Sequence, residues 1–349
     1  MKAIPTDERQ RLGALLEHAS QEEVMAMIPQ FEEAEICNIA AAPAASEGSP
    51  LRLLVFNMER GVHIDEIVDF LTACPGVQPF DVILANELDD GCVRSGGKDT
   101  TKELARRLGL NYVYGLEFIE LVNREDPKGF HGNAIFSRYP LTRARVVRMP
   151  EQNNWYFDRQ RRIGGRLAIL AEVDVNGRRV GMVTVHLENR TDGPGRFAQL
   201  HCVLEAAEEF FPAGMPVAIG GDLNTNTFDG RDVSAIRAIV DSPALQQRCL
   251  DEVEVWEECL PDARKFGYEI LPGGLAPTRR KALPEGGWLS LRLDWLLVRG
   301  MTPGAQRVIS TRTEDCGFAP EGSALAAFDG EELSDHNAVW AEVQLAPER

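Results

Sequence analysis

Residues 216–226 of this chain read PVAIGGDLNTN, an apolar run that ends abruptly in acidic and amide side chains. A short apolar run that contains Val and Ile is typical of a buried strand. Asp222 and Asn224 follow this run directly. A carboxylate or amide next to a core needs a hydrogen-bond partner or a ligand. The end of this strand is therefore a candidate functional position.

The same arrangement recurs at other strand ends. Asn57 and Glu59 follow LRLLVF, Glu87 follows DVILAN, and His186 follows VGMVTV. One polar residue at a strand end usually belongs to a turn or a cap. Recurrence with carboxylate, amide and imidazole groups instead indicates a site where the strands of a sandwich meet their loops.

Two further segments extend this set. Asp294 lies inside the apolar strand RLDWLLVRG, and the adjacent Asp335 and His336 lie in SDHN, directly before the last strand. A carboxylate inside a strand is costly unless it has a partner, and a histidine can supply one.

The order of elements predicts an α/β fold. The first half of the chain alternates strands with helices at about 65–73 and 101–110, and strands with short connections follow. The segment 166–187 forms a hairpin by its pattern, with Asn176-Gly177 as the turn. Helices are expected at about 195–211 and between 231 and 250. Two similar halves with antiparallel hairpins between them predict two packed mixed sheets with helices on the outer faces.

The N-terminal region differs from the rest. Residues 1–40 are predicted to form a helical extension, because Ser20 and Glu23 have the spacing of a capping box. The segment 41–50, AAPAASEGSP, has the composition of a linker. A catalytic domain is expected over 51–349. The extension either packs on the flank of this domain or docks a partner.

Composition indicates an ordinary globular protein, with 44% hydrophobic and 26% charged residues. The seven cysteines are scattered without zinc-binding spacing, which favours reduced thiols. We find neither a signal peptide nor an apolar run long enough to span a membrane, so we expect a cytoplasmic protein.

The net charge of −17 disfavours unguided capture of nucleic acid, which normally rests on Lys and Arg. Carboxylates that hold a cation contribute part of such a charge, and the bound metal then supplies a local positive field. The net charge alone therefore does not exclude a polyanionic substrate.

The motifs FNME, ANEL, GNAIFSRYP, VHL, GDLNTN, RLDW and SDHN occur in this order between Leu51 and Leu345. In this order they resemble the endonuclease/exonuclease/phosphatase superfamily, which includes deoxyribonucleases, apurinic endonucleases, sphingomyelinases and inositol-polyphosphate 5-phosphatases. The resemblance implies a four-layer α-β-β-α sandwich and metal-dependent hydrolysis of phosphate esters.

The resemblance also implies a metal site for Mg²⁺ or Mn²⁺. Glu87 matches the principal ligand, Asn57 lies close by, and Asp335 completes the shell through water. Glu59 is a possible second carboxylate ligand. Carboxylate and amide oxygens suit such hard cations.

Five residues match the family's catalytic groups. His336 resembles a general base oriented by Asp294, while Asp222 and Asn224 resemble the pair that contacts the water and the phosphoryl oxygens. His186 resembles a donor to a phosphate oxygen or to the leaving group. Whether Asp222 or His336 takes the proton stays open.

Three residues are candidates for substrate binding. His131 and Asn133 lie in GFHGNAIFS, a segment that enters the family's cleft, although a loop histidine is equally compatible with surface structure. Arg166 ends the basic stretch RQRRIGGR at 159–166. This stretch either contacts a polyanionic substrate or forms a solvated loop.

The substrate class stays open among three alternatives. The leading one is a phosphodiesterase of the nuclease kind that acts on DNA or RNA. A lipid or small-molecule phosphodiesterase or phosphomonoesterase is the second, and a non-catalytic binding protein on this fold is a remote third. The catalytic tyrosine motif of apurinic endonucleases is absent, which disfavours cleavage at abasic sites.

Overall fold

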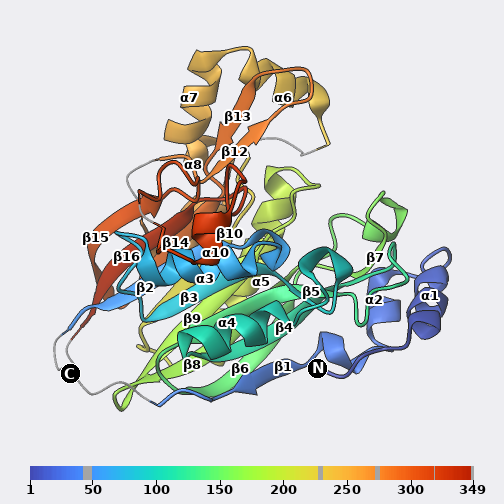
Figure 1. Ribbon diagram of the computed structural model, residues 1–349, viewed down its shortest axis with the longest axis horizontal. Helices are drawn as coiled ribbons and strands as arrows, with labels where there is room; N and C mark the ends of the chain where they lie inside the picture. Colours follow the sequence, from blue (N-terminus) through green and yellow to red (C-terminus); the bar gives the residue numbers. More distant parts are fainter. Residues whose placement is uncertain (42–48, 227–230, 272–275, 318, 347–349) are drawn as a thin grey trace.

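The computed structural model describes residues 1–349 except 42–48, 227–230, 272–275, 318 and 347–349. Two mixed β-sheets pack face to face at its centre, and helices cover their outer faces (Figure 1). The predicted α/β fold, a four-layer sandwich of helices, sheet, sheet and helices, is confirmed.

The larger sheet contains eight strands in the order β1, β4, β5, β3, β2, β16, β15, with β7 paired to β4. Only β2 and β3 run parallel in it. Its strands are β1 (Ala34–Cys37), β2 (Leu51–Asn57), β3 (Val82–Asp90), β4 (Asn111–Glu120), β5 (Phe130–Ser137), β7 (Arg162–Gly164), β15 (Met301–Ile309) and β16 (Ala338–Leu345).

The smaller sheet contains six strands in the order β11, β14, β10, β9, β8, β6. Here β9 and β10 are the parallel pair. The hairpin β8–β9 turns at Asn176-Gly177, as predicted, and both turn residues have positive φ. The strands are β6 (Leu141–Arg148), β8 (Leu167–Val175), β9 (Arg178–His186), β10 (Val217–Asp222), β11 (Glu269–Leu271) and β14 (Asp294–Arg299).

Alternation of apolar side chains along each strand builds the layers. In β2, Leu53 and Val55 point into the core between the two sheets. Leu54 and Phe56 point to the other face, where α3 (Ile64–Ala73) and α4 (Thr100–Leu108) cover the sheet. A strand that is buried on both faces is apolar throughout, which explains the run LRLLVF.

The outer face of the smaller sheet is covered by α5 (Gly193–Phe210) and α9 (Cys259–Lys265), which form a third apolar cluster with β9, β10 and β14. The remaining helices are short: α1 (Thr6–Leu15), α2 (Gln21–Met25), α6 (Val233–Val240), α7 (Pro243–Asp251), α8 (Val253–Trp256) and α10 (Ala324–Ala327). The helices predicted at 65–73, 101–110, 195–211 and between 231 and 250 are therefore confirmed.

A small subdomain projects from the sandwich above its strand ends (Figure 1). It combines α6 and α7 with the two-stranded sheet of β12 (Arg279–Ala282) and β13 (Trp288–Leu291), and it has its own apolar cluster. Its helices are inserted between β10 and β14, so it is built from the connection that follows Asp222.

The N-terminal extension is attached to the sandwich. The capping box of Ser20 and Glu23 begins α2 as predicted. A helical extension over 1–40 is only partly correct, because Ala34–Cys37 forms β1 and pairs with β4 at the sheet edge. A strand of four residues carries too little periodicity to be read from sequence. Most of the predicted linker at 41–50 lies outside the described residues.

All seven cysteines are free thiols, as the sequence predicted. Within the described part of the chain, no helix is both long enough and apolar enough to cross a membrane.

A fully buried ion pair fixes α5 to the segment that follows α8. The guanidinium of Arg196 meets the Glu257 carboxylate at 2.7 Å, and neither side chain is exposed. Arg196 also donates to the backbone carbonyl of Thr191 at 2.7 Å. Gln199, three residues further along α5, has a structural role as well, because its side chain donates to the backbone carbonyl of Pro150 at 3.0 Å.

Replacing Arg196 by Met should lower the free energy of unfolding by about 3–5 kcal/mol, because Glu257 then keeps a buried charge without its partner. Adding Glu257→Met should restore much of the loss. Urea unfolding of the two single variants and the double variant measures the coupling. Arg11→Met, which removes an exposed pair with Glu8, is the control and should cost less than about 1 kcal/mol. Equal losses in the single and double variants would contradict the expected coupling.

Candidate active site

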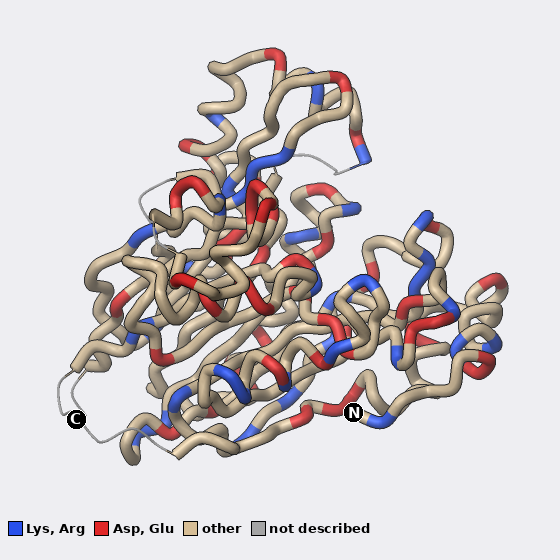
Figure 2. The backbone as a smooth tube through the Cα atoms, viewed as in Figure 1, with Lys and Arg blue, Asp and Glu red and all other residues tan. Residues whose placement is uncertain are grey.

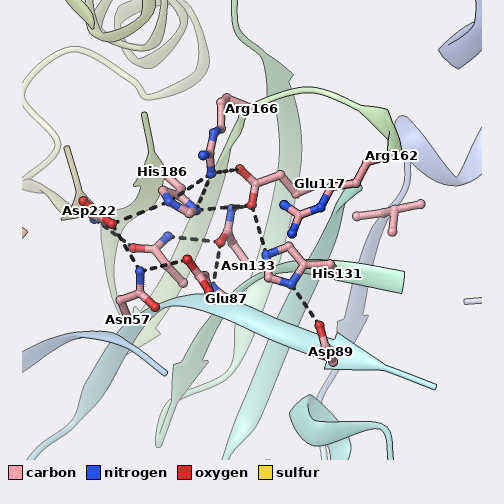
Figure 3. Close-up of polar contacts among 12 residues, drawn as sticks. Asn57, Glu87, Asp89, Glu117, His131, Asn133, Arg162, Arg166, His186 and Asp222 are labelled. Atoms are coloured by element: carbon pink, nitrogen blue, oxygen red, sulfur yellow. Dashed lines mark hydrogen bonds and ion pairs between the residues drawn. The ribbon is translucent and has the colours of Figure 1, made fainter. Parts of the chain in front are cut away.

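A polar cleft of about 110 Å³ lies where the strands of both sheets end. Nine of the twelve residues predicted for the site line it: Glu59, Glu87, His131, Arg166, His186, Asp222, Asn224, Asp335 and His336. The other three, Asn57, Asn133 and Asp294, hydrogen-bond to lining residues. Figure 3 shows the part of this constellation around Glu87 and Glu117.

The register of three neighbouring strands assembles the catalytic candidates. Asp222, the last residue of β10, is paired with His186 of β9 on one side and with Asp294 of β14 on the other. Gly221 permits this close approach, because a Cβ there would lie 1.9 Å from the carbonyl oxygen of Val185. Three ionisable groups thus meet at one sheet edge through backbone pairing alone.

Asp222 lies between two imidazole rings. Its Oδ2 atom is 3.5 Å from Nε2 of His186 and 3.7 Å from Nε2 of His336. A buried carboxylate contacts the other nitrogen of each ring: Asp294 lies 2.8 Å from Nδ1 of His336, and Glu117 lies 3.3 Å from Nδ1 of His186. A carboxylate in this position orients the ring and fixes its tautomer.

The surrounding charges keep His336 protonated in this structure. Burial alone would lower the pKa of His336, but the carboxylates of Asp294 and Asp222 raise it to about 10. The imidazolium of His336 is thus a stable positive group beside Asp222.

Glu87 projects into the cleft from a bulge in β3. The register between β3 and β5 shifts between Ala85 and Leu88, and Glu87 has a φ of 56°. Its backbone N–H donates to Oδ1 of Asn133 at 3.2 Å. Burial opposes ionisation of Glu87, yet nearby positive groups, first among them Arg60, hold the pKa of Glu87 well below its usual range. Glu87 is therefore ionised at neutral pH.

Backbone strain concentrates at this site. Five described residues other than glycine have positive φ, and four of them lie here: Glu59 (43°), Arg60 (67°), Glu87 (56°) and Asn224 (47°). The fifth, Asn176, is in the hairpin turn. Such conformations cost about 1–3 kcal/mol each and cluster at functional sites, where the surrounding structure enforces them.

The donor set suits a hard divalent cation. Burial raises the pKa of Glu59, and the negative charges of Asp335 and Glu87 raise it further. Three carboxylates that repel one another are stabilised by a cation between them. A second group, Asp222, Asp294 and His336, offers ligand atoms within 4.8 Å of one another. In that group Nδ1 of His336 is already hydrogen-bonded to Asp294.

Asn57 lies between these two groups. Its Nδ2 atom donates to Oδ2 of Asp222 at 3.2 Å and to Oε1 of Glu87 at 3.4 Å. Its Oδ1 atom accepts from the backbone N–H of Glu59. The amide therefore connects the Asp222 group with the carboxylates of the expected metal site.

Sequence reasoning missed Glu117, which is fully buried at the centre of the polar network (Figure 3). Its carboxylate accepts from Arg166 at 3.0 Å and from Nδ2 of Asn133 at 3.4 Å, besides its contact with His186. The available signal was a carboxylate inside the apolar strand NYVYGLEFIEL. The same signal had identified Asp294.

Two arginines of the basic stretch 159–166 lie in the cleft. Arg162 and Arg166 are 5% and 6% exposed and line the cleft, so the solvated-loop prediction is wrong for them. His131 is buried as well, and its Nδ1 atom lies 2.9 Å from Asp89. The surface alternative for His131 is therefore also wrong.

Comparisons with known proteins identify the family of this chain. The sequence profile of the Endonuclease/Exonuclease/phosphatase family matches residues 54–336. The chain therefore belongs to the endonuclease/exonuclease/phosphatase family. Members of this family are generally phosphoesterases that depend on divalent metal ions and act on phosphate esters such as nucleic acids.

Several solved structures share the fold. The endonuclease/exonuclease/phosphatase from Beutenbergia cavernae DSM 12333 is 19% identical, with a TM-score of 0.55 over 85% of this chain and 72% of that chain. The human Nocturnin catalytic domain with bound sulfate is 15% identical, with a TM-score of 0.50 over 90% and 97%. A family protein from Bacteroides thetaiotaomicron is 14% identical, with a TM-score of 0.51 over 86% and 97%. No curated protein matches the chain.

The free energy of unfolding should depend on pH through Glu117. Burial alone would raise the pKa of Glu117, but His186 and Arg166 lower it to about 2 from 4.5. Because the folded pKa is depressed, the carboxylate stabilises the fold above about pH 4.5, and this stabilisation is lost as the pH falls toward 2.

Glu117→Gln should therefore destabilise the protein at pH 7, by on the order of 3 kcal/mol. The difference from wild type should shrink below pH 4.5. Urea unfolding at pH 7, 5 and 3.5 measures it, with Glu103→Gln, at a half-buried position on α4 away from the cleft, as the matched control. A difference that stays constant over this pH range would show that Glu117 does not act through its charge.

Proposed function

We propose that this protein is a divalent-metal-dependent phosphodiesterase of the nuclease kind. The observation that carries the proposal is Asp222 between two imidazoles, each backed by a buried carboxylate. Beside this group lie the carboxylates suited to a cation. Such a set can activate water and stabilise a phosphoryl group in one cleft.

Glu87, Glu59 and Asp335, with Asn57 beside them, would hold Mg²⁺ or Mn²⁺, which neutralises charge that develops on the phosphoryl oxygens. Asp335 already donates its backbone N–H to Glu59 at 3.0 Å and pairs with Arg279 at 2.6 Å, so its position is supported from both sides. This support favours a preorganised ligand set.

Asp222 and His336 hold the attacking water, and Asp222 takes its proton as the new oxygen–phosphorus bond forms, because the ring of His336 already carries a proton. Asn224 orients the same water or a phosphoryl oxygen, and its side chain is itself held by donation to the carbonyl of Leu187. Asp294 keeps the ring of His336 in place. The positioning of these groups precedes substrate binding and requires no rearrangement.

His186 and Arg166 serve the opposite side of the phosphoryl group. Nη1 of Arg166 lies 2.9 Å from Nε2 of His186, so the two side chains offer positive charge and hydrogen-bond donors to the same part of the cleft. They stabilise a phosphoryl oxygen, or His186 supplies a proton to the leaving oxygen as its bond to phosphorus breaks. His131 and Asn133 support substrate binding through their contacts around Glu117.

A nuclease substrate is favoured by the charges in the cleft. Acidic and basic residues are interspersed along most of the chain (Figure 2), and the net charge is −17. The cleft nevertheless contains four arginines, Arg60, Arg162, Arg166 and Arg279. Arg279 begins a run of three cations on β12, which forms an isolated bridge with His336. A polyanion fits this local field better than a neutral ester.

The substrate class is tested by hydrolysis of single- and double-stranded DNA, RNA, phosphoinositides, sphingomyelin and bis(p-nitrophenyl) phosphate with Mg²⁺, Mn²⁺ or chelator. We expect turnover of nucleic acid with metal and none with chelator. Faster turnover of a lipid would replace the nuclease assignment with the lipid alternative. Absence of turnover on every substrate with metal would favour the non-catalytic alternative.

His336→Ala and Glu87→Ala should each lower the rate by about 10²- to 10⁴-fold, because the first removes the positive partner of Asp222 and the second removes a proposed metal ligand. Circular dichroism should show that both variants keep the fold. His18→Ala, which changes an exposed histidine on the extension, is the control. Rates near that of wild type in either variant would refute the proposed site.

A further inference from the structure

One wall of the cleft has no role in the chemistry described above. It is formed by Arg60, Trp155, Gln160 and Arg162. In Figure 3, Arg162 and Asp222 lie on opposite sides of Glu117 and Arg166. A substrate whose reacting phosphoryl group lies at Asp222 would therefore extend toward this wall.

Arg60 is the cation of this wall without a partner. No hydrogen bond or ion pair joins its guanidinium to any other residue in the described part of the chain, and its Nε atom is buried without an acceptor. Its φ of 67° is unfavourable for arginine, so the fold holds it there against strain. The positive charge of Arg60 acts to lower the pKa of Glu59 and of Glu87, and both carboxylates belong to the proposed metal site.

Arg162 adds a second positive group that is only partly neutralised. Its Nε atom lies 3.0 Å from Glu120, but the same carboxylate also binds Arg94 at 2.9 Å. Burial lowers the pKa of Arg162, and the positive charges of Arg94 and Arg60 lower it further, against the opposing effect of Glu120. Two guanidiniums that repel each other across a cleft form a site for an anion.

Additional contacts fix this wall in place. Nη2 of Arg162 donates to Oε1 of Gln160 at 2.7 Å, and its guanidinium lies over the ring of Trp155 at 5.1 Å. From outside the cleft, the buried Gln21 of α2 accepts from the backbone N–H of Gly164 at 2.8 Å and donates to Asn154 at 3.0 Å. The extension thus supports the wall from behind β7. A phosphate group that reaches Arg162 therefore meets side chains that are already held in place.

We propose that Arg60 and Arg162 form a second anion subsite that binds a terminal phosphate of the substrate, one nucleotide away from the phosphodiester that is hydrolysed. The inference rests on the proposed function and narrows its substrate to nucleic-acid ends or short nucleotides with a terminal phosphomonoester. The dianionic phosphate accepts bidentate hydrogen bonds from the two guanidiniums.

The test compares three thymidine dinucleotides: pTpT, TpTp and the unphosphorylated TpT. With Mg²⁺ or Mn²⁺, wild type should hydrolyse one phosphorylated dinucleotide with a kcat/KM at least about tenfold above that of TpT, since charged hydrogen bonds have this size. Arg60→Gln should bring this ratio close to one, mainly through the KM of the phosphorylated dinucleotide. Because the ratio is taken to TpT in the same variant, any effect of Arg60 on the proposed metal site cancels.

Two further variants complete the design. Arg162→Gln should act in the same direction, but Arg162 is buried, so thermal unfolding must show that this variant folds. Arg60→Gln alters a half-buried side chain without a partner and decides the question alone if Arg162→Gln does not fold. Arg106→Gln removes an exposed arginine on α4 and should leave the ratio unchanged.

The outcomes separate the subsite from the proposed function. Hydrolysis of TpT or bis(p-nitrophenyl) phosphate without preference for a terminal phosphate overturns the subsite and leaves the function standing. Equal losses on all three dinucleotides in Arg60→Gln also overturn it. If no compound is hydrolysed, the proposed function fails, and the Kd values of the intact dinucleotides then decide: equal values for pTpT, TpTp and TpT overturn the subsite.

Discussion

The pairing of β10 with β9 on one side and β14 on the other determines where chemistry can occur in this fold. Backbone hydrogen bonds fix the register, and the register brings His186, Asp222 and Asp294 to one edge. Side chains alone could not hold three ionisable groups so close, because each would move toward water. The ladder prevents this movement, and the cost of burial is offset by pairing each carboxylate with an imidazole or a guanidinium.

The larger sheet meets this edge through amides. The backbone N–H of Asp222 donates to Oδ1 of Asn86 at 2.9 Å, and Nδ2 of Asn86 donates to Asn133 at 3.2 Å. Asn57 adds its contacts to Asp222 and Glu87. Neutral amides can bridge the two sheets without adding charge to a region that already contains many carboxylates. The position of Glu87 relative to Asp222 therefore follows from sheet packing.

Sequence predicted the fold and nine of the residues that line the cleft, and its failures have physical causes. Apolar runs identified the central strands, because such strands are buried on both faces. The edge strand β15 was missed, since Pro303 and Gly304 are poor strand formers that an edge tolerates. Glu117 was missed because a bulge between Leu116 and Phe118 decides which way it points. Bulges depend on the neighbouring strand, so the sequence shows the carboxylate inside an apolar run but not the face on which it lies.

The same limit applies to Arg60. Its left-handed backbone is enforced by the turn after β2, where Gly61 packs against Thr100. Nothing in the sequence distinguishes this arginine from the many that form surface ion pairs. The net charge of −17 says equally little about the cleft. It sums over the whole chain, whereas a ligand in the cleft meets only the groups that line it. Carboxylates there are paired or suited to a cation, whereas the guanidinium of Arg60 has no partner among the described residues, so it is a positive group that an incoming anion can still pair with.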